Sequence, residues 1–92
     1  MSETLLLADD EEDIRRFLGL FLADLGYVVH AAANGEEALA VLDEVDPAIV
    51  LTDIKMPVMD GLELLKRIKA KSSDIEVVMI SGHGDMELAI QS

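Results

Sequence analysis

The chain has 92 residues, 51% of them apolar and 28% charged, with a net charge of −12 and no cysteine. This length and composition predict one small globular domain over residues 1–92, and the missing thiols exclude disulfides and thiolate metal sites. The many carboxylates disfavour nucleic acid binding by this segment and favour cation binding. No basic stretch precedes an apolar one at the N-terminus and no run is long enough to span a bilayer, so we expect a cytoplasmic protein without membrane contact.

The first predicted strand is the apolar run Thr4 to Ala8, and five consecutive acids follow it. The acids from Glu11 onward are typical of a helix start, where the helix dipole favours negative charge. Apolar side chains then recur at helical spacing and predict a helix from about residue 12 to 25 with one apolar face: Ile14, Phe17, Leu18, Phe21, Leu22 and Leu25. Gly26 is expected to end this helix as a C-terminal cap.

A strand over Tyr27 to Ala31 and a second helix come next. Asn34 and Glu37 have the spacing of a capping box, which satisfies backbone N–H groups at the start of a helix. Val45-Asp46-Pro47 is expected to end this helix, because the residue before a proline disfavours helical geometry.

The central strand is predicted over Ile49 to Asp53. A continuous apolar run this short is typical of a strand buried on both faces, and it places the carboxylate of Asp53 at the C-terminal end. Asp60 and Glu63 have the spacing of a second capping box, so a third helix is predicted from Gly61 to about Lys71.

A fourth strand is predicted over Ile75 to Ile80, then a turn over Ser81 to Gly84, and the start of a fourth helix over Asp85 to Ser92. Four strand–helix units with such short connections form a parallel sheet with right-handed crossovers. The predicted fold class is therefore α/β, a flavodoxin-like doubly wound parallel sheet with strand order 2-1-3-4.

In this strand order the first and third strands are neighbours, so Asp9, Asp10 and Asp53 should meet at the carboxyl edge of the sheet. Carboxylates this close repel one another, which costs stability unless a cation lies among them. A few carboxylates with waters completing an octahedron suit Mg²⁺ better than Ca²⁺ or zinc. Such a site typically shares its Mg²⁺ with a phosphate, and Asp53 is then placed to accept a phosphoryl group as a nucleophile.

Three motifs resemble the receiver domain of two-component response regulators, and they cover the whole chain in the order and spacing of that family. They are Leu7 to Glu11, Thr52 to Gly61 and Met79 to Gly84. The resemblance implies the CheY-like form of the flavodoxin-like fold. It also implies a phosphoacceptor with at most slow self-dephosphorylation rather than an enzyme.

The resemblance assigns roles to the site residues. Asp53 matches the phosphoacceptor, and Asp9 and Asp10 match the acid pair that binds Mg²⁺ together with it. The backbone carbonyl of Lys55 matches a further metal ligand. The implied partner that supplies the phosphoryl group is a sensor histidine kinase.

Three residues are implied to act on the phosphorylated state. Ser81 matches the hydroxyl that moves to hydrogen-bond the phosphoryl group, and Lys55 and His83 occupy flanking positions that modulate its lifetime. The segment Ser81 to Asp85 is also similar to receivers that precede ATPase-type transcriptional activators. The resemblance therefore implies regulation of transcription through an output domain outside this segment.

Receivers of this family continue through a fifth strand, which ends in a phosphate-binding lysine, and a fifth helix, whereas this sequence stops at Ser92. The expectation is a C-terminally truncated receiver in which no lysine takes that place and one sheet face and the fourth-strand edge are uncovered. Self-association, most simply as a homodimer, is expected to cover them. The alternative function is a receiver-like interaction module that no longer switches. An aspartate-based phosphatase is disfavoured, because that chemistry requires a second acid at the position that Lys55 occupies.

Overall fold

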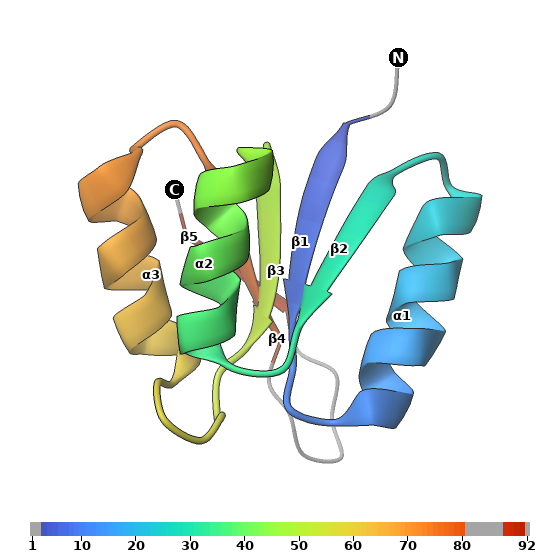
Figure 1. Ribbon diagram of the computed structural model, residues 1–92, viewed down its shortest axis with the longest axis horizontal. Coiled ribbons are helices and arrows are strands. Elements are labelled where there is room, and N and C mark those ends of the chain that lie inside the picture. Colours follow the sequence, from blue (N-terminus) through green and yellow to red (C-terminus); the bar gives the residue numbers. More distant parts are fainter. Residues whose placement is uncertain (1–2, 81–87, 92) are drawn as a thin grey trace.

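The computed structural model describes residues 3–80 and the backbone of residues 88–91, which form an open sheet with helices on both faces (Figure 1). The strands are β1 (Thr4–Ala8), β2 (Val28–Ala32), β3 (Ile49–Asp53), β4 (Glu76–Ile80) and β5 (Leu88–Gln91), and the helices are α1 (Glu12–Asp24), α2 (Gly35–Val45) and α3 (Gly61–Lys71). The strand order is β2-β1-β3-β4-β5. None of the described helices has the length and apolar character needed to cross a membrane.

Strands β1 to β4 run parallel in the order 2-1-3-4, which confirms the predicted fold class. Their carboxyl ends therefore lie at one edge of the sheet. β1 and β3 are neighbours, and their register places Ala8 beside Thr52. Asp9 and Asp53 follow these two positions, so they lie at the same end of the sheet.

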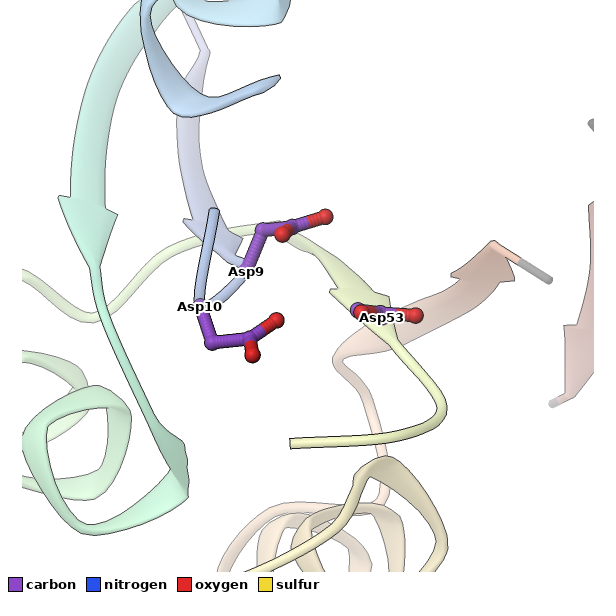
Figure 2. A group of neighbouring side chains, drawn as sticks. All are labelled: Asp9, Asp10 and Asp53. Carbon is purple, nitrogen blue, oxygen red and sulfur yellow. The ribbon is translucent and has the colours of Figure 1, made fainter. Parts of the chain in front are cut away.

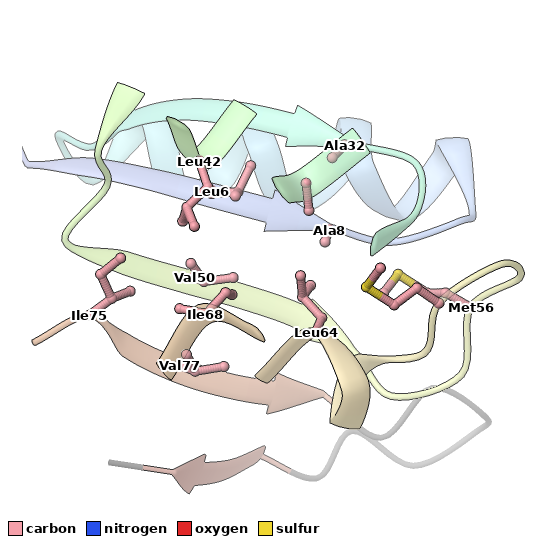
Figure 3. Packing of buried hydrophobic residues seen from close by; sticks show 12 residues of the cluster. Leu6, Ala8, Ala32, Leu42, Val50, Met56, Leu64, Ile68, Ile75 and Val77 are labelled. Carbon is pink, nitrogen blue, oxygen red and sulfur yellow. The ribbon is translucent and has the colours of Figure 1, made fainter. Parts of the chain in front are cut away.

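The main core lies between the sheet and the two helices α2 and α3 (Figure 3). Leu6, Val50 and Val77 project from three neighbouring strands and are fully buried. They belong to one cluster with Leu64 and Ile68 of α3. Burial of a side chain this large contributes roughly 1.5–3 kcal/mol, so this cluster holds β3 firmly in the middle of the sheet.

Both predicted capping residues begin their helices. Asn34 Oδ1 accepts a hydrogen bond from the Glu37 N–H at 2.9 Å, and Asp60 Oδ1 accepts one from the Glu63 N–H at 2.8 Å. The second half of each box differs from the expected pattern. The Glu37 carboxylate accepts from the Ala33 N–H, and Glu63 pairs with an arginine one turn further along.

Gly26 caps the C-terminal end of α1, as the sequence predicts. The Gly26 N–H donates to the Ala23 carbonyl at 3.0 Å and the Tyr27 N–H to the Leu22 carbonyl at 3.2 Å. This pair of bonds is a Schellman motif, which satisfies carbonyls of the last helical turn. Gly26 has φ of 107°, a conformation that residues with a Cβ rarely adopt.

The apolar face of α1 is less covered than its helical pattern suggests. α1 packs on β1 and β2. Three members of the predicted face are half-buried, namely Ile14, Leu18 and Leu22. Phe17, Phe21 and Leu25 are 69%, 55% and 61% exposed. Periodicity identifies an apolar stripe, but it does not say how much of that stripe another layer covers.

The prediction of a fourth helix over Asp85 to Ser92 is wrong where the structure describes that segment. Leu88–Gln91 forms β5, which runs antiparallel to β4 and pairs Ala89 with Met79. The outer edge of β4 offers a row of backbone N–H and C=O groups, and pairing satisfies these groups on both strands. The described chain thus has three strand–helix units in place of four, and the β4 edge expected to be open is paired.

Candidate functional site

Two neighbouring strands bring three carboxylates together at the carboxyl edge of the sheet. Asp9 and Asp10 follow the end of β1, and Asp53 is the last residue of β3. One oxygen atom from each of the three lies within 4.8 Å of the others, and Figure 2 shows Asp9 and Asp10 extending toward the end of β3. The juxtaposition predicted from the strand order is therefore present.

Burial differs among the three acids. Asp9 and Asp53 are each 4% exposed, whereas Asp10 is exposed to solvent. The backbone of Asp9 is fixed on both sides, because its N–H donates to the Ala32 carbonyl at 3.1 Å and its carbonyl accepts from Arg15 Nη1 at 2.8 Å. The Asp9 side chain is therefore attached to a rigid strand end.

The pKa of Asp9 is raised above its ordinary value. Burial is the main cause, because a buried carboxyl loses the water that stabilises its charge. The Glu11 N–H opposes this by donating to Asp9 Oδ1 at 2.8 Å. The negative charges of Asp53, Asp10 and Glu11 raise the pKa further. Two of these three neighbours are the other acids of the group, so a cation placed among them would relieve the repulsion.

The donor set fits Mg²⁺. Carboxylate oxygens are the ligands that this hard cation prefers, and with few protein ligands it keeps several waters. The exposed Asp10 leaves one side of the group open for those waters. No histidine belongs to the group that the described residues form, which favours Mg²⁺ over zinc.

An open cavity of about 420 Å³ adjoins the acidic group. It shares Asp10 with that group and is otherwise lined by Glu11, Lys55, Met56, Pro57 and Asp60. Lys55 is exposed in the loop between β3 and α3, beside the predicted site. The two other predicted residues, Ser81 and His83, lie outside the described residues.

Two residues that support the site did not emerge from the sequence pattern. Arg15 reaches from the first turn of α1 to the Asp9 carbonyl, and its only sequence signal is its position on the turn that follows the acids. Gly61 is buried and donates its N–H to the Ile54 carbonyl at 2.7 Å. The capping-box spacing predicts a helix start at this position, but it does not predict the close approach to the end of β3.

Comparison with known proteins gives a consistent result. A family model described as response regulator receiver domain matches residues 5–92. Sporulation initiation phosphotransferase F of Bacillus subtilis (strain 168) is 37% identical over 92 residues, which cover 100% of this chain and 74% of that protein. The C4-dicarboxylate transport transcriptional regulatory protein DctD of Rhizobium meliloti (strain 1021) is 38% identical over 89 residues, which cover 97% of this chain. They cover only 19% of DctD, so the chain spans about a fifth of that relative.

The likeness extends to solved structures. The chemotaxis protein CheY4 of Vibrio cholerae superposes with a TM-score of 0.86 at 31% sequence identity, and the match covers 92% of this chain and 72% of that one. NtrX of Brucella abortus superposes with a TM-score of 0.84 at 40% identity, covering 91% of this chain and 19% of that one. Sequence and structure comparisons therefore agree over nearly the whole chain.

Proposed function

Because the chain belongs to the response regulator receiver domain family, we propose that it is a signalling receiver that accepts a phosphoryl group on Asp53. The observation that carries this proposal is the meeting of Asp9, Asp10 and Asp53 at the carboxyl edge of the sheet. Asp53 ends the central strand, whose neighbours on both sides hold it in place. A rigidly held carboxylate is what in-line attack on phosphorus requires.

The proposed chemistry is a phosphoryl transfer from a phosphohistidine. A carboxylate oxygen of Asp53 attacks phosphorus, the P–N bond to the imidazole breaks, and its electron pair returns to the imidazole nitrogen. Asp9 and Asp10, together with Asp53 and the Lys55 carbonyl, would hold Mg²⁺. When bound, this ion offsets the negative charge that gathers on the transferred group. Asp9 and Asp10 must stay ionised to hold it.

We propose a sensor histidine kinase as the donor and the cytoplasm as the setting. Regulation of transcription is the proposed outcome, supported by the similarity to DctD, a transcriptional regulatory protein. Since this chain spans about a fifth of that relative, the output domain remains part of the proposal. Self-association through exposed apolar side chains of α1 is also proposed, and slow loss of the phosphoryl group is the only catalysis expected.

The test is phosphorylation by a small phosphodonor such as acetyl phosphate, with and without Mg²⁺. Intact-mass measurement should find one labile phosphoryl adduct that depends on Mg²⁺ and disappears in Asp53→Asn. Asp60→Asn is the matched control, because Asp60 lies beside the cavity but outside the acidic group. An adduct that persists in Asp53→Asn contradicts the assignment. No adduct in the folded parent chain would favour the interaction module that no longer switches.

A further inference from the structure

Gly61, the first residue of α3, lies directly against the backbone that carries Asp53. A Cβ at this position would overlap the Asp53 carbonyl oxygen and lie 3.0 Å from Ile54 Cα. These neighbours are backbone atoms at the end of the central strand, so they cannot move aside as a side chain could. The absence of a side chain at Gly61 therefore lets α3 begin in contact with β3.

The same loop is held at a second glycine, Gly35, the first residue of α2. A Cβ there would lie 2.7 Å from Met59 Cβ and 2.9 Å from the Met59 carbonyl oxygen. Met59 is buried although it belongs to a loop, and it is a member of the core cluster. In Figure 1 the loop 54–60 runs beside the first turns of both α2 and α3.

The backbone of this loop is tightly wound. The Met59 N–H donates to the Pro57 carbonyl at 2.8 Å, across a single residue, Val58. Val58 has φ of 72°, which is a rare conformation for a β-branched residue. Such a conformation persists only where the surroundings enforce it. Gly61 lies against Asp53 and Ile54 at the start of the loop, and Gly35 lies against Met59, the residue that follows Val58.

We propose that Gly35 and Gly61 are positioning residues that clamp the loop 54–60 so that the cation site takes the geometry Mg²⁺ demands. This inference rests on the proposed function, because the loop carries Lys55, whose carbonyl is a proposed ligand. Gly61 also abuts the backbone of Asp53 itself. The two glycines together, here called the glycine clamp, thus act on two of the four proposed ligands.

Cation selectivity separates this role from simple support of the fold. Mg²⁺ requires a near-ideal octahedron at about 2.0–2.1 Å, whereas Ca²⁺ accepts irregular oxygen sets at about 2.3–2.6 Å. A loop displaced by a new Cβ should therefore lose Mg²⁺ affinity while keeping more of its Ca²⁺ affinity. A substitution that merely destabilises the fold should weaken both cations by the same factor in the folded protein.

The experiment measures Mg²⁺ and Ca²⁺ dissociation constants for the parent chain, Gly61→Ala and Gly35→Ala by following backbone amide chemical shifts of Asp10 and Lys55. Gly26→Ala is the matched control, because it strains the backbone at the end of α1, where a Cβ meets nothing within 4 Å. In Gly61→Ala the ratio of the Mg²⁺ dissociation constant to the Ca²⁺ dissociation constant should rise roughly 10-fold or more, which is the usual effect of losing a group that orients a metal ligand. Gly26→Ala should leave this ratio unchanged.

Each outcome decides the proposal. An unchanged ratio in folded Gly61→Ala overturns it. If Gly61→Ala does not fold, Gly35→Ala decides, because its new Cβ would lie 2.7 Å from the nearest Met59 atom, a less severe contact than the overlap with the Asp53 carbonyl oxygen at Gly61. A raised ratio in Gly35→Ala then supports the clamp, and an unchanged ratio overturns it. Failure of the parent chain to bind Mg²⁺ contradicts the proposed metal site itself, whereas Mg²⁺ binding whose strength relative to Ca²⁺ is unchanged by both substitutions contradicts only the clamp.

Discussion

Protonation of Asp9 should control both cation binding and the stability of the cation-free fold. Its pKa is raised, chiefly by burial and further by the negative charge of Asp53. A carboxyl whose pKa is raised on folding holds its proton more tightly in the folded state than in the unfolded chain. Without a cation, ionisation of Asp9 therefore destabilises the fold as the pH rises from the ordinary pKa of 3.8 through the raised pKa. Cation binding needs the ionised form, so its affinity falls as pH falls through that range.

Asp9→Asn tests this relation. Its amide oxygen can still accept the Glu11 N–H, but it carries no charge. Without Mg²⁺ we expect the variant to have a higher free energy of unfolding than the parent chain at neutral pH. The difference should vanish as the pH approaches 3.8. Urea denaturation across this pH range measures the difference in free energy of unfolding. Repeated with excess Mg²⁺, it should show that Mg²⁺ stabilises the parent chain more than the variant. A difference that does not change with pH would contradict the prediction.

Lys55 is expected to protect a phosphoryl group on Asp53. Its long side chain is exposed and lines the cavity beside Asp10. Lys55→Ala should admit water and speed loss of the phosphoryl group about two- to tenfold, which corresponds to about 0.4–1.4 kcal/mol of activation free energy. The measurement is the decay of the intact-mass adduct after the phosphodonor is removed. Lys66→Ala, which removes an exposed lysine from α3, is the control, and equal decay in both variants would show that Lys55 is only a solvated loop residue.

The grouping of the acids could be predicted from the sequence because the end of a predicted strand specifies where a residue lies in the sheet. Asp9 and Asp53 follow short apolar runs, and parallel strands align their carboxyl ends. Arg15 could not be predicted as a partner of the Asp9 carbonyl, because a side chain-to-backbone bond across six residues leaves no periodic signal. The tight contact of Gly61 could not be predicted for a similar reason, since it depends on where α3 meets β3 in space.

Among the elements, the C-terminus of α1 allows a clean test of backbone strain. Gly26 has φ of 107°, and a Cβ there meets nothing within 4 Å. Gly26→Ala should therefore destabilise the fold by about 1–2 kcal/mol through backbone conformation alone. Gly19 lies inside the same helix and also has nothing within 4 Å of a Cβ. Gly19→Ala should stabilise the fold by about 0.5–1 kcal/mol, because alanine favours helix interiors.

Urea denaturation of the two variants measures these effects, provided that the denaturant slope stays constant. Opposite signs for the two substitutions are the expected result. Destabilisation by Gly19→Ala would mean that its position is constrained by something other than helical propensity. A neutral Gly26→Ala would mean that the cap relaxes to a conformation that alanine can adopt.

The elements that could be predicted best are those specified by sequence patterns only a few residues long. The apolar runs of β1 and β3 and the caps Asn34 and Asp60 specify local structure, and the structure confirms them. The segment Leu88–Gln91 behaves differently, because its pairing with the edge of β4 depends on a strand more than seven residues away. Short segments follow such tertiary contacts rather than their own propensity, since isolated short helices are marginal in water.

At the scale of the whole molecule, the two faces of the sheet are covered unequally. α2 and α3 cover one face, and the core cluster lies beneath them. α1 covers the other face, and large apolar side chains on it stay exposed. These side chains, here called the α1 stripe, are Phe17, Leu20, Phe21 and Leu25, exposed by 69%, 73%, 55% and 61%. Their spacing places them on one side of the helix, which is the pattern of a surface that packs against a partner.

We therefore expect this chain to self-associate through the α1 stripe. Burying each of these side chains would gain roughly 1.5–3 kcal/mol, and a closed two-fold dimer is the commonest arrangement. Light scattering should give a mass near twice 10.0 kDa, and the unfolding midpoint should rise with protein concentration. Each copy carries a net charge of −12, so added salt should strengthen the association by screening the repulsion.

Two matched double variants locate the contact. Phe17→Gln with Phe21→Gln removes the centre of the α1 stripe and should give a monomer whose midpoint ignores concentration. Val58→Gln with Leu62→Gln removes two other exposed apolar side chains, 73% and 54% exposed, from the region of the loop and α3. This second variant should remain dimeric, because its substitutions lie outside the stripe. If both variants behave alike, or if the parent chain is itself a monomer with a constant midpoint, α1 is covered well enough without a partner and the stripe is not an interface.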